Sequence, residues 1–282
     1  MNFDQILEDY AKLNNFKRNE TLLKIQSSLD TNSLDETCIK SNSYQQLLKL
    51  GIEDSYDVCR ESTCSLLKKS YESLKENKDK VQMCDSFMHL LLTHLIDKAS
   101  NEIEEVKLGA LTVLTIYIEP INKKGILKEF DTIVKMVHIY VKDTCPECPV
   151  LLLQFVNCLH LTMKEEIHMI QEQLIISLAL LSNHKHKEVR RTMVNTLLSL
   201  YSSPFDRISN TIPTLYPAFS ILTKDKIINI RLDTCKLLEL LLNINTDKNE
   251  NINIITYLSI CAEDSNPAVK ELALNTLKHY NQ

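Results

Sequence analysis

Apolar residues recur along the chain at the three- and four-residue spacing of amphipathic helices. The clearest copy is KEVRRTMVNTLLSL, in which Val194 and Leu197 stand four and seven positions after Arg190. The same pattern follows Arg231 and Lys270, and another amphipathic segment precedes each copy. The pattern therefore predicts pairs of helices repeated head to tail.

We call the residue at the Arg190 position of each copy the anchor. Successive anchors stand 39 to 47 residues apart, which is typical of HEAT-type repeats. The predicted anchors are Arg18, Arg60, Lys107, Leu151, Arg190, Arg231 and Lys270. We predict an all-α fold, a HEAT/armadillo-type α-solenoid of about seven antiparallel helix pairs that forms a single domain over residues 1–282. The expected pairs are 3–29, 43–73, 82–117, 127–162, 166–200, 205–243 and 251–279.

An acidic residue stands six positions before several anchors. Asp54, Asp225 and Asp264 hold this position, and Asn101, Cys145 and His184 stand there in other copies. An acid in the turn between the helices and a base entering the second helix can bond across neighbouring repeats, and the acid suits the positive end of that helix. The expected ladder comprises Asp54, Arg60, Lys107, Arg190, Asp225, Arg231, Asp264 and Lys270. We expect it to be interrupted at Leu151, which is not basic.

Composition narrows the classes of function. The formal net charge is −5 and no long basic stripe occurs, which argues against a nucleic-acid partner. Only three glycines are present, so phosphate-binding glycine loops and tight β-hairpins are not expected. No catalytic motif, secretory leader or membrane span is recognised. We expect a cytoplasmic protein that is not an enzyme, with no catalytic residues, no cofactor and no membrane partner.

Cys145 and Cys148 form a CxxC motif, the spacing at which two thiolates converge on zinc. Cys158 and His160 are the further residues that could complete a tetrahedral site. The alternative is that these thiols pack as small apolar groups, because Pro149 suits a first helical turn and a second CxxC is missing from the sequence. Packing is the favoured interpretation, and the cysteine pair remains a weak metal candidate.

The segment SNHKHKEVRR concentrates histidines and basic residues in one predicted turn. Its placement between two helices favours a solvated turn of the repeat over a metal site. A basic surface that docks an acidic partner is the functional alternative. The residues that would form this surface are Lys185, Lys187 and Arg191, with Lys224 and Lys226 in the next repeat.

Several segments resemble the dynein axonemal assembly factor 5 family, which is a HEAT-repeat family. They are VCRESTCSLL, EEVKLGALTVL, HMIQEQLIISLALLSNHKHKEVRRTMVNTL and DSNPAVKELALNTL. The resemblance implies a cytoplasmic factor that preassembles outer and inner dynein arms in ciliated cells. It implies dynein chains, chaperones and co-chaperones as partners and offers no catalytic residues.

Two other functions stay open on the sequence alone. A microtubule-binding or transport adaptor would use the basic turn residues to meet acidic surfaces. A metal-binding protein would use Cys145 and Cys148.

Overall fold

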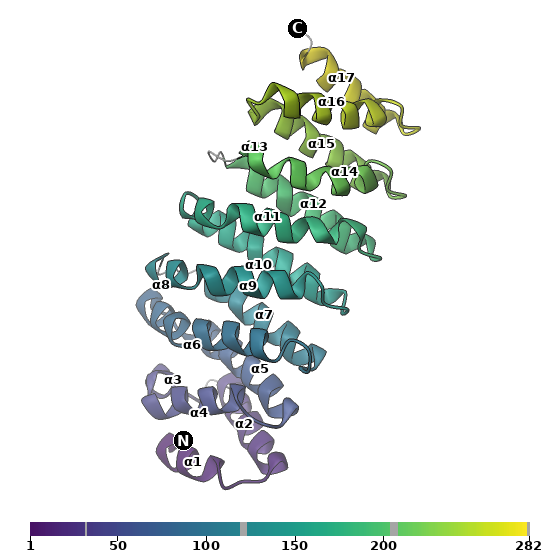
Figure 1. The fold of residues 1–282 in the computed structure, drawn as a ribbon. Coiled ribbons are helices and arrows are strands. Elements are labelled where there is room, and N and C mark those ends of the chain that lie inside the picture. The colour runs from purple at the N-terminus through teal and green to yellow at the C-terminus, as the bar shows by residue number, and fades with distance from the viewer. Residues whose placement is uncertain (32, 119–122, 204–207, 281–282) are drawn as a thin grey trace. The chain divides into compact units, whose positions relative to one another are not determined.

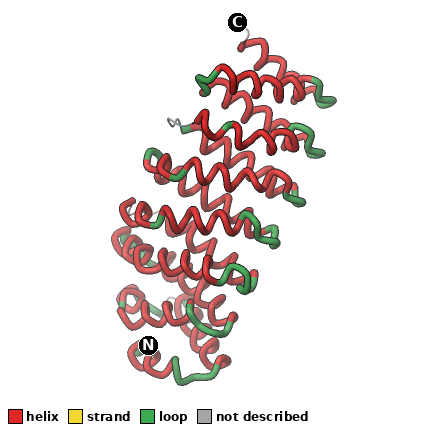
Figure 2. Tube along the Cα trace, in the orientation of Figure 1, coloured by secondary structure: helices red, strands yellow, loops and turns green. Residues whose placement is uncertain are grey.

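The computed structural model describes residues 1–31, 33–118, 123–203 and 208–280. All regular structure in these ranges is helical, and they contain no strand (Figure 2). Residues 205–207, which begin the sixth predicted helix pair, lie outside the described residues. The chain divides into two compact units, residues 1–136 and 137–282.

The first unit contains three helix pairs, in each of which a first helix (A helix) is followed by a second (B helix). Its A helices are α1 (Phe3–Tyr10), α4 (Asn42–Ile52) and α6 (Asn77–Asp97), and its B helices are α2 (Asn15–Asp30), α5 (Asp57–Ser73) and α7 (Glu104–Ile118). Two short helices, α3 (Glu36–Lys40) and α8 (Lys123–Lys128), accompany them, and α9 (Phe130–Tyr140) spans the unit boundary. The B helices pack in succession, α2 on α5 and α5 on α7 (Figure 1).

The second unit repeats this arrangement. Its B helices are α10 (Glu147–Met163), α12 (Lys187–Ser202), α15 (Ile228–Ile244) and α17 (Pro267–Tyr280), and each packs on the next. The A segments between them comprise η1 (Glu166–Met169), α11 (Gln171–Ala179), η2 (Leu180–Asn183), α13 (Ile208–Thr211), η3 (Pro213–Leu215), α14 (Tyr216–Leu222) and α16 (Lys248–Ala262).

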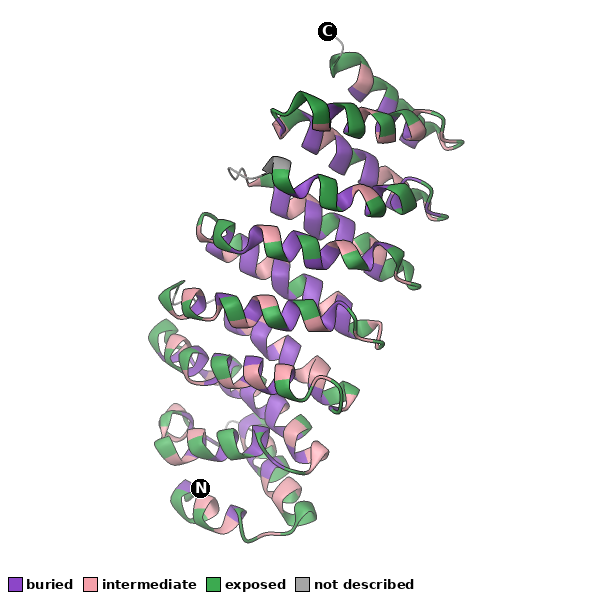
Figure 3. Ribbon diagram, viewed as in Figure 1, coloured by how far each residue is buried: buried purple, intermediate pink, exposed green. Residues whose placement is uncertain are grey.

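The B helices supply much of the core because they are covered by an A helix and by neighbouring B helices (Figure 3). In α12 the residues one before and three, four, seven and ten after Arg190 are fully or almost fully buried. They are Val189, Met193, Val194, Leu197 and Leu200. Full burial of each such apolar side chain stabilises the folded state by about 1.5–3 kcal/mol relative to leaving it exposed.

The predicted register of α10 is wrong by two residues. The buried residues Cys148, Leu152, Leu153 and Val156 lie one before and three, four and seven after Pro149. Pro149 therefore holds the anchor position, and Asp143, rather than Cys145, stands six positions earlier. Pro149 lies 42 residues after Lys107 and 41 before Arg190, so the corrected register is also the more regular one.

One predicted stripe residue is exposed. Leu274, four positions after Lys270, is 48% exposed. Helix α17 instead buries Val269, Ala273 and Thr276 where it packs against α15 and α16.

Candidate functional site

Arginine–aspartate pairs join consecutive repeats in the second unit. Arg190 donates to both carboxylate oxygens of Asp225, with Nε–Oδ2 at 2.6 Å and Nη2–Oδ1 at 3.0 Å. Arg231 makes the same two bonds to Asp264, at 2.6 and 2.9 Å. This two-pronged, charge-assisted geometry fixes the orientation of both partners, so each B helix is tied to the turn of the next repeat.

The same guanidinium groups also hold their own turns. Nη1 of Arg190 donates to the carbonyl of His184, and Nη1 of Arg231 to that of Asp225, both at 2.7 Å. Asp225 accepts the backbone N–H of Ile227 at 2.9 Å. Each arginine therefore connects the turn before its own helix with the turn of the next repeat, and it uses all three side-chain nitrogens to do so.

The first unit contains two further arginine–acid pairs, with one change of partner. Arg18 Nη2 lies 2.9 Å from Asp54 Oδ1, and the Tyr10 hydroxyl donates to the same carboxylate at 3.0 Å. Arg60 bonds Glu102, at 2.8 Å from Nε and 2.6 Å from Nη2. The residue six positions before the anchor Lys107 is Asn101. Glu102, the next residue, bonds Arg60 instead, because a glutamate side chain is one methylene longer than an aspartate and can reach the guanidinium from there.

Glu102 is the most enclosed acid of the ladder, with a side chain that is 0% exposed. Besides Arg60, it accepts from the backbone N–H of Ile103 at 3.0 Å and lies 2.7 Å from Nε2 of His94. Burial lowers the pKa of His94, although the neighbouring Glu102 opposes that shift. Of this cluster of arginine, glutamate and histidine, the sequence indicated only Arg60.

A hollow of about 540 Å³ adjoins this cluster, lined by Asp54, Arg60, Asp97, Lys98 and Glu102 among others. Arg60 is only 13% exposed, and its bonds to Glu102 and to the carbonyl of Asp54 use its three nitrogens. Three of the five N–H groups of Arg60 thus hold Glu102 and the turn that contains Asp54.

The anchors Lys107 and Lys270 lie in the first turns of α7 and α17. The ladder bonds described above are made by Arg18, Arg60, Arg190 and Arg231. Arginine suits this role better than lysine because its planar group makes the two-pronged bond and the inner bond together.

Three acids that bond to the anchor arginines, Asp225, Asp264 and Glu102, have lowered pKa values. Burial raises the pKa of Asp225, but the Arg190 guanidinium and the Ile227 N–H outweigh it and the net shift is downward. Arg231 lowers the pKa of Asp264 against an opposing effect of burial. For Glu102 burial again raises the pKa, and Arg60, the Ile103 N–H and His94 together reverse that effect.

The protein is expected to lose stability in acid below about pH 4, the ordinary range of these carboxyl groups. Because the folded-state pKa values lie below the unfolded ones, the stabilisation is complete above that range and disappears as the pH falls through the folded-state values. Urea unfolding followed by circular dichroism at pH 7, 5, 4 and 3 measures this. If the urea concentration at the unfolding midpoint were the same at pH 5 and pH 3, this prediction would be wrong.

Asp143, Cys145 and Cys148 lie together at the start of α10. One carboxylate oxygen and the two sulfur atoms are all within 4.8 Å of one another. Cys158 and His160 do not join this group, because they lie about ten residues, or roughly 15 Å, further along the helix. The imidazole of His160 instead has Nε2 3.4 Å from the Ser203 hydroxyl, and burial lowers its pKa.

The predicted basic turn is largely at the surface. Lys185, Lys187, Lys224 and Lys226 are exposed. Arg191 is half-exposed and lies 3.7 Å from Asp233 of α15. Its charge is thereby partly balanced within the protein, whereas the four lysines are presented to solvent. Lys187 begins α12, where a positive charge opposes the helix dipole, so helix stability does not account for its presence.

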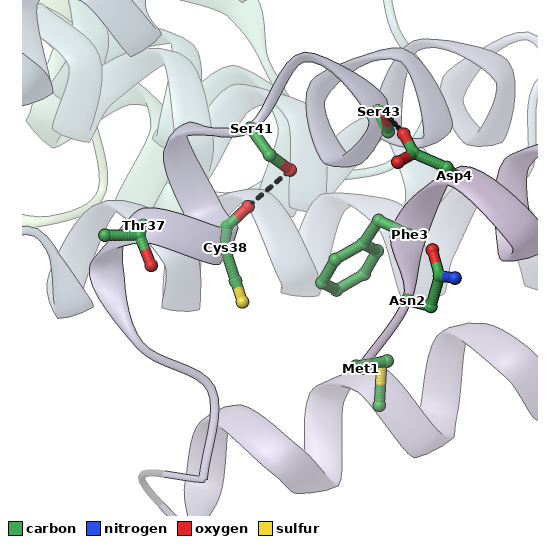
Figure 4. Close-up of a pocket in the computed structure, with 8 residues that line it drawn as sticks. All are labelled: Met1, Asn2, Phe3, Asp4, Thr37, Cys38, Ser41 and Ser43. Carbon is green, nitrogen blue, oxygen red and sulfur yellow. Dashed lines mark hydrogen bonds between the residues drawn. The ribbon is translucent and has the colours of Figure 1, made fainter.

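A second hollow, of about 580 Å³, lies near the start of the chain between α1, α3 and α4 (Figure 4). The Asp4 carboxylate accepts from the Ser43 hydroxyl, and the Ser41 hydroxyl donates to the carbonyl of Cys38 at 2.7 Å. Burial, together with Asp35, raises the pKa of the Cys38 thiol. This thiol is therefore not an activated nucleophile at neutral pH.

No helix in the described part of the chain combines the length and apolarity needed to cross a bilayer. A family model described as "Dynein axonemal assembly factor 5-like, TPR repeats" matches residues 9–216. No curated protein sequence matches the chain.

Several solved structures have a similar fold. A designed armadillo repeat protein in complex with the peptide (KR)4 has a TM-score of 0.62 at 15% identity, covering 84% of this chain and 99% of that one. Computationally designed armadillo repeat proteins for modular peptide recognition give 0.59 at 16% identity, covering 83% and 98%. A chain of the Kap95p–RanGDP structure gives 0.65 at 11% identity, covering 87% of this chain and 32% of that one. At these identities the likeness concerns the fold, and it confirms the predicted all-α armadillo/HEAT-repeat class.

Proposed function

The chain belongs to the dynein axonemal assembly factor 5-like family, and from this premise we propose that it is a non-enzymatic, protein-binding scaffold for the preassembly of axonemal dynein arms. The family match over residues 9–216 is the observation that carries the proposal. We place this activity in the cytoplasm of ciliated cells, with dynein chains, chaperones and co-chaperones as partners.

The B helices of the second unit supply a binding row that suits this role. Gln154, Asn195, Lys236 and Asn275 each lie five positions after the anchor of their helix, and all four are exposed. The four helices pack in sequence, so these equivalent positions form one row. Three of the four side chains are amides, which both donate and accept hydrogen bonds and so fit the main chain of an extended client segment. Lys236 donates to Asp233 at 2.9 Å. The designed armadillo proteins named above, one of them in complex with a peptide, support this mode of binding for the shared fold.

The experiment is purification of the tagged chain from ciliated cells, with identification of the proteins that accompany it. We expect dynein heavy chains and chaperones, and we expect cells that lack the protein to build axonemes short of dynein arms. Normal arms in such cells would reject the proposal.

The binding row is tested in the same purification. Gln154→Ala with Asn195→Ala should reduce recovery of dynein chains. The matched control is Gln173→Ala with Asn183→Ala, which changes two exposed amides of an A segment in the same unit. If both variants recover the same amount of dynein chains, the row does not bind the client. The role in dynein-arm assembly is tested separately, by the dynein arms in axonemes of cells that lack the protein.

A second candidate function is a microtubule-binding or transport adaptor, and the exposed lysines favour it. Lys185 and Lys187 lie in one turn and Lys224 and Lys226 in the next, where they can meet an acidic surface. Co-sedimentation with microtubules at low salt, lost in Lys185→Glu with Lys187→Glu but kept in Lys75→Glu with Lys78→Glu, would support this function. Absence of co-sedimentation at low salt would reject it.

A further inference from the structure

Two cysteines and two acids occupy one short segment at the entrance to α10, DTCPEC at residues 143–148. Asp143 and Cys145 are half-buried in the turn, while Cys148 is fully buried in the first helical turn. A carboxylate oxygen of Asp143 and both sulfur atoms lie within 4.8 Å of one another. Side chains that start so close need little movement to share one ion.

We propose that Asp143, Cys145 and Cys148 bind a thiophilic divalent metal ion, with zinc as the expected ion, and that Glu147 supplies the fourth ligand. Zinc takes sulfur ligands at about 2.3 Å and carboxylate oxygens at about 2.0–2.2 Å. Around a tetrahedral ion these bonds separate the ligand atoms by about 3.3–3.8 Å. The observed grouping is close to that arrangement.

Glu147 is placed to complete the coordination. Its carboxylate oxygen Oε2 lies 3.4 Å from Sγ of Cys145. The side chain is exposed at the first position of α10, so it can turn toward the ion without disturbing the core. The four ligands would then be two thiolates and two carboxylates, all from six consecutive residues.

The metal would replace a missing arginine. In the turns before α5, α12 and α15, an anchor guanidinium donates to the carbonyl six residues earlier, in each case at 2.7 Å. The equivalent residue in α10 is Pro149, which cannot make such a bond. An ion bound to Asp143, Cys145 and Cys148 would connect the same turn to the same first helical turn. The site therefore occurs where the repeat pattern lacks its usual connection.

A bound divalent ion supplies the positive charge that deprotonates a coordinating thiol. Asp143 accepts the backbone N–H of Cys145 at 2.9 Å, as Asp225 does from Ile227, which fixes its carboxylate beside the two sulfur atoms. On binding, the two thiols release their protons to solvent and the sulfur atoms take up the metal bonds, so affinity should fall with decreasing pH.

The experiment is a cobalt titration of the whole chain, kept reduced with a phosphine. We expect one ion per chain, with the thiolate-to-cobalt charge-transfer band and the visible bands of tetrahedral cobalt, and displacement by zinc. Cys145→Ser should abolish the charge-transfer band, and Asp143→Ala should weaken binding roughly tenfold or more, as loss of a ligand does at least as much as loss of an outer contact.

The matched controls are Cys158→Ser, which changes another half-buried thiol of α10, and Cys38→Ser, which changes a half-buried thiol of the first unit. Both should bind cobalt as the unaltered chain does. Circular dichroism establishes that the Cys145→Ser chain is folded; Cys148 is not used because its full burial makes the variant prone to unfold. Fewer than one ion per chain, a spectrum without the thiolate band, or full binding by folded Cys145→Ser would each overturn the proposal. None of these outcomes tests the role in dynein-arm assembly, which is measured by the dynein arms in axonemes of cells that lack the protein.

Discussion

Glu102→Ala is expected to lower the free energy of unfolding of the first unit by about 3–5 kcal/mol, the usual loss when one partner of a buried charge pair is removed. The glutamate accepts from two nitrogens of Arg60 and contacts His94, and its own side chain is fully enclosed. Without it, a sheltered guanidinium and an imidazole remain without their acceptor. Glu102→Gln keeps the shape but not the charge, so its loss should be smaller.

Urea unfolding by circular dichroism, with hydrogen exchange of peptides from α5, α6 and α7, measures this effect. Exchange is needed because repeat proteins can lose structure in one region before another. The control is Glu105→Ala, which changes an exposed acid of α7 and should have an effect within about 0.5 kcal/mol. Similar stabilities for the two variants would show that the cluster does not stabilise the fold.

Gly109→Leu is expected to lower the free energy of unfolding by about 1–3 kcal/mol, the typical cost of overpacking a filled interface. A Cβ atom at this position would lie 2.9 Å from Cβ of Cys64, so α5 and α7 approach too closely for a side chain. Glycine inside a helix costs about 1 kcal/mol relative to alanine, which makes close packing the reason for its presence.

The measurement is again urea unfolding, compared with Glu105→Leu, which places the same side chain on an exposed position of the same helix. We expect protection from hydrogen exchange to fall in α5 and α7 of the glycine variant. Unfolding of the two variants at the same urea concentration would mean that α5 and α7 are not in close contact at Gly109.

Residue type and spacing predicted the arginine–acid pairs that depend on strict equivalence between repeats. Asp225 and Asp264 stand at the same distance before their anchors, and the structure brings them to Arg190 and Arg231. Glu102 could not be found in this way, because a longer side chain acts from a position one residue later. Finding it requires knowing how far each acid reaches, which spacing alone does not contain.

The α10 register shows a second limit of sequence reasoning. Apolar residues are so dense in PVLLLQFVNCLHL that several alignments satisfy the helical pattern equally well. The alignment on Leu151 gives spacings of 44 and 39 residues to the neighbouring anchors, whereas the burial pattern of α10 puts Pro149 at the anchor, with spacings of 42 and 41.

The description of the family model names TPR repeats, whereas the repeat length here is that of armadillo and HEAT proteins. TPR units are about 34 residues long, and HEAT and armadillo units about 40–47. Asp225 and Asp264, which hold equivalent positions, are 39 residues apart in the sequence. The similar solved structures agree with the longer unit.

The arginine–acid bonds also restrict how a chain of this kind can change in length. They join residues that are 33 to 42 positions apart, from Arg231–Asp264 to Arg60–Glu102. Duplication or loss of a whole helix pair with its turn leaves every guanidinium with a carboxylate. The spread from 33 to 42 positions shows that a loop inside the span can change in length, as in the residues between α2 and α4, which lie within the Arg18–Asp54 span. Growth by entire modules is thus a direct result of where one cation finds its counter-ion.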